Sequence, residues 1–264
     1  MTKIKVNEIN YYYEEVGDKE PLLLIAGLSC DLSIWTSVLD KLSQNFRIIM
    51  FDNRDVGRTD YVNTEYTVDD MADDTVRLIK KLGYEKVSIL GHSMGGAIAQ
   101  NIAYRYPEVV DRLIISNSLV QAPTVSLVAM EFAGKLREIS TDISLSAQSI
   151  APWIYSDDYL RFDNNLQKLG ELMQSYPFPQ RADGYLRQLN ALNKFDSGGY
   201  LHQIKHLTLI IAGSHDLLTP LSQSQIMADH IPNSQLVVLP GSHLPIIEVP
   251  PLFVKTVERF LLNQ

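Results

Sequence analysis

The sequence lacks the features that mark secreted, membrane-spanning and nucleic-acid-binding proteins. It has one cysteine, Cys30, so no internal disulfide can form, and no basic region followed by an apolar segment opens it. No apolar run approaches the roughly 18 residues that indicate a membrane span. The formal net charge is -8 and no basic block occurs, which makes nucleic acid and anionic membrane surfaces poor candidate partners. These absences predict a cytoplasmic protein.

The composition is that of a folded domain. Of the 264 residues, 45% are hydrophobic and 20% are charged, which argues against disorder. This length fits one α/β domain or one domain with an insertion. No internal repeat or low-complexity linker divides the sequence. Cys30 is expected to be a small buried residue rather than a nucleophile.

Short apolar runs alternate with amphipathic segments through most of the chain. The apolar runs, expected to be buried strands, are residues 21–27, 46–51, 86–90, 109–117, 206–213 and 235–239. The helical segments between and after them are residues 34–43, 67–82, 97–106, 221–230 and 251–262. Residues 3–6 and 9–15 predict an antiparallel hairpin at one edge. This alternation predicts an α/β fold, with a mostly parallel central sheet, helices on both faces and ligand sites at the carboxyl ends of the strands.

The alternation stops between residues 119 and 199. Strand-like runs disappear there, and helical periodicity with aromatic residues indicates four helices, over residues 127–139, 144–153, 157–173 and 181–193. We therefore expect a helical cap, or lid, at 119–199. The α/β core then consists of residues 1–118 and 200–264.

Acidic residues gather near the start of the helix expected at 67–82: Asp69, Asp70, Asp73 and Asp74. A helix dipole favours anions at this end. The interpretation we favour is a solvated helix end, with metal binding as the alternative.

The stretch Gly91-His92-Ser93-Met94-Gly95-Gly96 lies between an expected strand and an expected helix. Gly-x-Ser-x-Gly in this setting is typical of a nucleophile elbow, a tight turn that lifts the serine hydroxyl above the sheet edge. A glycine-rich turn used only for packing is the alternative. A base, an acid and an oxyanion site elsewhere in the chain would favour the nucleophile elbow over the packing turn.

The expected base and acid both follow late strands. Of six histidines, His243 is the one that follows the last expected strand at its carboxyl end, and Asp216 follows the strand before it. This gives the chain order Ser93, Asp216, His243, which is the order of a Ser-His-Asp triad in such a fold. The alternative for Asp216 is a helix cap or a turn, and for His243 a capping or packing role.

Two backbone N–H groups are expected to hold the oxyanion. One is that of Met94, directly after the serine, and the other is that of Leu28, in the loop after the first expected parallel strand. Backbone donors place little demand on side-chain identity, so Leu28 is inferred from its position alone.

The chain resembles the α/β-hydrolase fold family, in its branch with a serine nucleophile. The resemblance is carried by residues 24–28, 52–54 with Gly57, 91–96, and 213–216 with 241–243. The expected lid, with Trp153 and residues 188–192, is similar to that of small carboxylesterases and 3-oxoadipate enol-lactonase-like enzymes. Three positions depart from the usual family pattern: Ala26 replaces a histidine, Asp55 a glycine and Thr59 a serine. A serine at position 93 is unlike the haloalkane dehalogenase and epoxide hydrolase branches, which have aspartate there.

These features predict an enzyme, a serine hydrolase that cleaves a small carboxylic ester or lactone through an acyl-enzyme. No metal and no cofactor is implied, and the partner is a small acyl substrate. The expected pocket residues of the lid are Trp153, Tyr155, Met130, Phe132 and Phe178. Two alternatives stay open: carbon–carbon bond hydrolysis or cofactor-free perhydrolysis by the same triad, and a ligand-binding signalling module with slow turnover.

Overall fold

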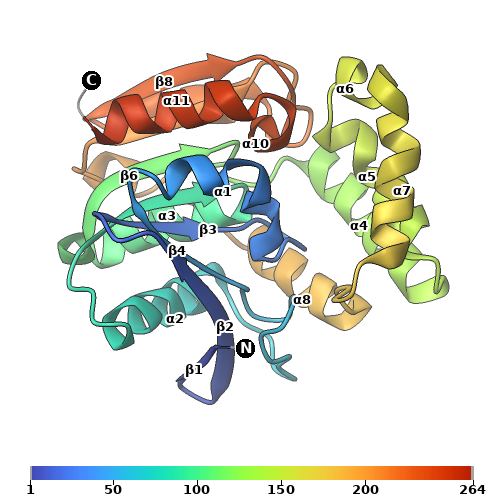
Figure 1. The fold of residues 1–264 in the computed structure, drawn as a ribbon, viewed down its shortest axis with the longest axis horizontal. Coiled ribbons are helices and arrows are strands. Elements are labelled where there is room, and N and C mark those ends of the chain that lie inside the picture. The colour runs from blue at the N-terminus through green and yellow to red at the C-terminus, as the bar shows by residue number, and fades with distance from the viewer. Residues whose placement is uncertain (1, 263–264) are drawn as a thin grey trace.

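One eight-stranded sheet runs through the computed structural model, which describes residues 2–262 (Figure 1). The strand order is β1-β2-β4-β3-β5-β6-β7-β8. The hairpin β1–β2 and the pair β2–β4 are antiparallel, and the remaining neighbours are parallel. The predicted α/β fold and its antiparallel edge are confirmed. The strands are β1 (Lys3–Val6), β2 (Ile9–Val16), β3 (Pro21–Ile25), β4 (Arg47–Phe51), β5 (Val87–His92), β6 (Val110–Ser116), β7 (Thr208–Gly213) and β8 (Ser234–Leu239).

Helices cover both faces of the sheet because both faces are apolar. In β3, Leu23 and Ile25 belong to one buried cluster, and Leu22 and Leu24 belong to the other. This is the alternation that a strand imposes on its side chains. The first cluster includes residues of α2 (Val68–Lys81), α3 (Met94–Arg105) and α9 (Leu221–His230). The second includes residues of α1 (Thr36–Leu42), α10 (Pro245–Glu248) and α11 (Pro250–Leu261).

Five helices and no strand separate β6 from β7. They are α4 (Thr124–Ile139), α5 (Ile143–Ile154), α6 (Asp157–Arg161), α7 (Asn165–Ser175) and α8 (Ala182–Asn193). Short 3-10 turns occur at Leu32–Trp35, Pro107–Val109, Phe162–Asn164 and Leu201–Gln203. Figure 1 shows α4 to α7 gathered at one side of the sheet. The two ends of the segment meet, because Gln121 and Asp196 form an antiparallel bridge and Ser197 N donates to Val120 O at 3.0 Å.

One predicted helix of this segment is wrong. Residues 157–173 were expected to be continuous, but the chain breaks at Asp163 and Asn164, whose φ angles are 49° and 57°. Aspartate and asparagine tolerate the left-handed region better than other residues that carry a side chain. Two consecutive residues in this region end α6 and start α7 in a new direction.

The solvated helix end expected at α2 is present for Asp69 and Asp70, which are exposed in its first turn, but Asp73 and Asp74 have partners within the fold. Asp74 is buried; it accepts a hydrogen bond from the Tyr11 hydroxyl and is ion-paired with Arg54. Asp73 is ion-paired with Arg105 of α3 at 2.6 Å. Asp70 also takes part in a capping box at the start of the helix. Asp73 and Asp74 connect α2 to the sheet and to α3, and no metal-binding cluster of acidic, histidine or cysteine residues occurs within residues 2–262.

A second buried ion pair holds α8 against the core. Asp55, with no exposed surface, receives Arg187 Nε at 2.8 Å and Arg187 Nη2 at 3.1 Å. It also accepts the Tyr66 hydroxyl and the Val62 N–H, each at 2.8 Å. Asp55 departs from the family pattern of the sequence, and this bidentate contact gives the departure a structural role.

Across residues 2–262, no helix is long and apolar enough to cross a membrane.

We expect Arg187→Met to lower the free energy of unfolding by about 3 kcal/mol, because it leaves the Asp55 charge buried without its partner. Equilibrium urea unfolding measures this change. The matched control is Arg161→Met, since Arg161 and Asp157 form an exposed pair on α6; it should leave stability nearly unchanged. Equal effects of the two substitutions would contradict this account of α8.

Candidate active site

Ser93 lies on a sharp turn between β5 and α3. Its backbone has φ 55° and ψ -120°, a conformation that strains any residue with a side chain. The flanking glycines make the turn possible: a Cβ on Gly91 would lie 2.2 Å from the Gly95 carbonyl oxygen, and one on Gly95 would lie 2.0 Å from that of Ile25. The turn predicted from the sequence is therefore present, with the serine 7% exposed at its tip.

Asp216 and His243 come together from the loops that follow β7 and β8. His243 Nδ1 lies 2.9 Å from Asp216 Oδ2, and both side chains are buried. Because β7 and β8 are parallel neighbours, their carboxyl ends lie at the same edge of the sheet. Because Asp216 is the partner of Nδ1, the Nε2 nitrogen of His243 remains available for another partner.

Four further donors surround the Asp216 carboxylate, one of which is the Thr219 N–H at 2.8 Å. The carboxylate also accepts the Thr219 hydroxyl at 2.6 Å, the Asn117 amide at 2.9 Å and the Leu218 N–H at 2.9 Å. Burial alone would raise the pKa of this carboxyl group, but His243 and the hydrogen bonds from Thr219 and Asn117 outweigh it, so the pKa lies below its usual value. Asp216 is thus held as an anion beside the imidazole.

Asn117 and Thr219 are functional-site residues that sequence reasoning missed. Asn117 follows β6 with φ 45°, and its amide also donates to the Ser242 carbonyl oxygen at 3.1 Å. It therefore connects the loop of Asp216 to the loop of His243. The available signal was its place after β6, the strand between β5 and β7, where a polar side chain faces the same edge as Ser93 and Asp216.

His92 brings the imidazole of His243 next to the elbow. Its ring lies 4.9 Å from that of His243, centroid to centroid, and it directly precedes Ser93. Burial, followed by the nearby His243, holds the pKa of His92 well below its usual range, so His92 is neutral.

Within residues 2–262 the Ser93 hydroxyl makes no hydrogen bond. Catalytic hydrogen bonds are often long in a site without substrate and tighten when substrate binds.

The loop expected to hold the oxyanion touches Ser93. A Cβ on Gly27 would lie 2.9 Å from Ser93 Cβ and 3.4 Å from Ser93 Oγ. Leu28 comes next, and Ser29 follows with φ 65°. Ser29 N–H donates to Gln188 Oε1 at 3.0 Å, and its hydroxyl accepts from Arg137 Nη2 at 2.9 Å. Helices α8 and α4 therefore both hold this loop.

Cys30, at the end of the same loop, does not have the surroundings of a reactive thiol. Burial, followed by the nearby charge of Asp31, raises the pKa of its thiol to about 12. The thiol therefore stays protonated at neutral pH, as expected of a structural cysteine, although the residue is half-buried rather than fully buried.

The five expected pocket residues lie in different surroundings. Met130 is buried, and Trp153 packs against the same apolar cluster, which also contains Met94. Tyr155 is stacked on Tyr159, and the Phe178 ring lies under the Arg58 guanidinium. Phe132 is 56% exposed on α4, which does not fit a residue that encloses a small acyl group.

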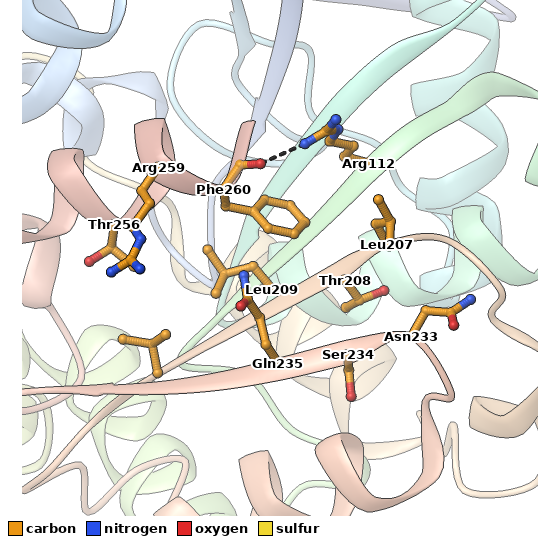
Figure 2. A pocket seen from close by; sticks show the side chains of 11 residues that line it. Arg112, Leu207, Thr208, Leu209, Asn233, Ser234, Gln235, Thr256, Arg259 and Phe260 are labelled. Atoms are coloured by element: carbon orange, nitrogen blue, oxygen red, sulfur yellow. Dashed lines mark hydrogen bonds between the residues drawn. The ribbon is translucent and has the colours of Figure 1, made fainter. Parts of the chain in front are cut away.

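A hollow of about 650 Å³ lies at the other end of the sheet (Figure 2). Thr208 and Ser234, the first residues of β7 and β8, line it together with Arg112 and Phe260. Arg112 donates to the Phe260 carbonyl oxygen at 2.6 Å across it. Because it lies at the amino ends of these strands, this hollow is separate from Ser93, Asp216 and His243.

Comparison with known proteins identifies the fold and its family. A family model described as alpha/beta hydrolase fold matches residues 20–250. The chain is 32% identical to "Putative carbamate hydrolase RutD" of Agrobacterium fabrum, over 91% of this chain and 92% of that protein. A thermophilic esterase from Thermogutta terrifontis, solved with malate bound, is 26% identical with a TM-score of 0.85, covering 99% of this chain and 98% of that one. The enol-lactonase of Burkholderia xenovorans LB400 has the same fold, with a TM-score of 0.88 at 24% identity, covering 99% of this chain and 100% of that one.

The lowered pKa of Asp216 predicts how its contribution to stability depends on pH. A carboxylate with a depressed pKa in the folded state stabilises that state fully above its unfolded pKa of about 3.9, and this contribution is lost as pH falls through the folded pKa. The difference in unfolding free energy between the unsubstituted protein and Asp216→Asn should therefore be largest near pH 6 and shrink toward pH 3. Urea unfolding at a series of pH values measures this difference. A difference that grows on acidification would show that the pKa of Asp216 is not lowered in the folded state.

Proposed function

Because the chain is a hydrolase that belongs to the alpha/beta hydrolase fold family, we propose that it cleaves a small carboxylic ester, lactone or carbamate through an acyl-enzyme on Ser93. The observation that carries the proposal is the 2.9 Å contact between Asp216 and His243, at the sheet edge where Ser93 lies on its strained turn. An ester, a lactone and a carbamate each offer a carbonyl carbon and a heteroatom leaving group, so one triad can act on all three.

In the proposed reaction, Ser93 Oγ attacks the carbonyl carbon while His243 Nε2 takes the hydroxyl proton. Asp216 fixes the tautomer of His243 and stabilises the charged imidazolium. His243 then returns the proton to the leaving oxygen or nitrogen, and the carbon–heteroatom bond breaks. A water molecule, deprotonated by His243, hydrolyses the acyl-enzyme and frees Ser93.

The proposed oxyanion donors are the N–H groups of Met94 and Leu28. Neither donates to another residue in the described part of the chain, and Gly27 places its loop against Ser93. Donors fixed in advance stabilise the charge that develops on the carbonyl oxygen, and losing one typically costs about 3 kcal/mol of transition-state stabilisation.

We propose that residues 119–199 form a lid over a core made of 1–118 and 200–264. The antiparallel bridge between Gln121 and Asp196 supports these boundaries, because it closes the base of the segment. Met130 and Trp153 are the lid residues best supported as pocket residues, since they share an apolar cluster with Met94 and Leu28. This environment suits a small acyl group.

Ser93→Ala should abolish both covalent labelling by a fluorophosphonate and hydrolysis of p-nitrophenyl acetate, because it removes the nucleophile. The melting temperature should change little. Ser222→Ala, on the exposed face of α9, is the matched control and should keep both properties. Retained labelling of Ser93→Ala would overturn the nucleophile assignment.

Substrate panels then separate the kinds of hydrolysis. Esters, lactones and carbamates matched in size, compared by kcat/KM, identify the preferred class, and a diketone substrate tests the carbon–carbon alternative. A signalling protein would be labelled at Ser93 and yet show hydrolysis near background.

Activity should fall with a single-proton slope as the solution is acidified, that is, about tenfold in kcat/KM per pH unit. Asp216 is already ionised because its pKa is lowered, and His92 stays neutral because burial lowers its own. The proposed base is His243, and a base that already carries a proton cannot accept one from Ser93. A rate that is flat from pH 8 to 5, or a two-proton slope, would contradict this assignment.

A further inference from the structure

Arg137 of α4 is a cation that the protein surrounds only with neutral groups. Its Nη2 donates to the Ser29 hydroxyl at 2.9 Å, its Nε to the Ser146 hydroxyl at 3.0 Å, and its Nη1 to the Gln180 carbonyl oxygen at 3.4 Å. Its guanidinium carbon lies 4.5 Å from the centre of the Tyr185 ring. Within residues 2–262, no aspartate or glutamate is ion-paired with it.

The other arginines near this site have carboxylate partners. Arg54 is paired with Asp74, Arg58 with Asp52, and Arg187 with Asp55, and each of these aspartates is buried. The pKa of each of these three arginines is raised. Burial instead lowers the pKa of Arg137. A half-buried cation without a counter-charge costs free energy, so the position of Arg137 suits an anion that the chain itself does not supply.

Arg137 is close to the proposed nucleophile. Its partner Ser29 is two residues beyond Gly27, which touches Ser93, and two residues span at most about 7 Å. The protein packs closely around the guanidinium, and yet the residue keeps part of its surface accessible.

The guanidinium has donors left for a ligand. Three of its five N–H groups are used, which leaves one on each terminal nitrogen. Paired N–H groups of this kind match the two oxygens of a carboxylate. Because the chain has a net charge of -8, an anionic substrate needs a local cation to offset the repulsion.

We propose that Arg137 binds a carboxylate of the substrate, so that the preferred substrate is an ester, lactone or carbamate whose acyl part also carries an acid group. This rests on the proposed function for the position of the scissile bond. Because Ser29 is only two residues beyond Gly27, which contacts Ser93, a carboxylate on Arg137 would lie within a few bonds of the reacting carbonyl.

Paired substrates test the proposal. Mono-p-nitrophenyl esters of the C4 to C6 dicarboxylic acids are compared with the matching neutral esters, in which a primary amide replaces the free acid. For at least one chain length, kcat/KM should be more than tenfold higher for the acid than for its amide, after correction for hydrolysis without enzyme. A ratio near or below one at every length would overturn the proposal, while continued turnover of the amide esters would leave the proposed function standing.

Substitutions assign the preference to Arg137. Arg137→Met should lower the acid-to-amide ratio at least tenfold, and Arg137→Lys should restore part of it. Lys135→Met is the matched control, since it removes one positive charge from an exposed position on the same helix, and its ratio should equal that of the unsubstituted protein. An unchanged ratio in Arg137→Met would refute the assignment.

Direct binding keeps the proposal testable if the chain hydrolyses no ester. Calorimetry with glutarate should then show binding to the unsubstituted protein, weakened at least tenfold in Arg137→Met, or in Arg137→Lys if the methionine variant does not fold. Equal affinity, or no binding to the unsubstituted protein, would overturn the carboxylate site. Circular dichroism confirms that each variant is folded.

Discussion

The buried negative charge of Asp216 is the constraint on which the candidate active site depends. A carboxylate withdrawn from water must receive hydrogen bonds, and this one receives them from three loops: Asn117 after β6, Thr219 after β7, and His243 after β8. Satisfying the charge therefore draws three strand ends together. The imidazole is oriented as a result, and the contact between the His243 and His92 rings places it beside the elbow.

Two other buried aspartates also draw distant segments of the chain together. Asp74 joins α2 to β2 through Tyr11, and Asp55 joins α8 to the core through Arg187. Arg54 neutralises Asp74 and Arg187 neutralises Asp55, and the contact with Tyr11 adds a neutral donor from a distant strand. Such pairs add little net stability compared with apolar contacts, but they penalise any arrangement that separates them. They therefore specify where α2 and α8 lie.

The sequence predicts what local pattern determines. Strands and core helices follow from apolar runs and caps, and the elbow follows from Gly91, Ser93 and Gly95, because steric limits act over a few residues. Contacts between distant side chains were out of reach: Asn117 is 99 residues from Asp216, and no pattern links them. The same gap explains why the solvated helix end predicted for α2 fails at Asp73 and Asp74, whose partners are Arg105 for the first and Tyr11 and Arg54 for the second. Periodicity also placed Phe132 on a lid helix without telling which face it occupies.

The loop that carries the proposed oxyanion donor Leu28 shows how the helices between β6 and β7 affect the candidate active site. Ser29 has a left-handed backbone that a residue with a side chain adopts only when its surroundings hold it there. Gln188 of α8 accepts its N–H, and Arg137 of α4 donates to its hydroxyl. Leu28, the residue before it, has its position fixed by the same contacts. Because Asp55 and Arg187 fix α8 in turn, the geometry beside Ser93 depends on charges that lie outside the proposed triad. The proposed ligand of Arg137 would act on the same loop.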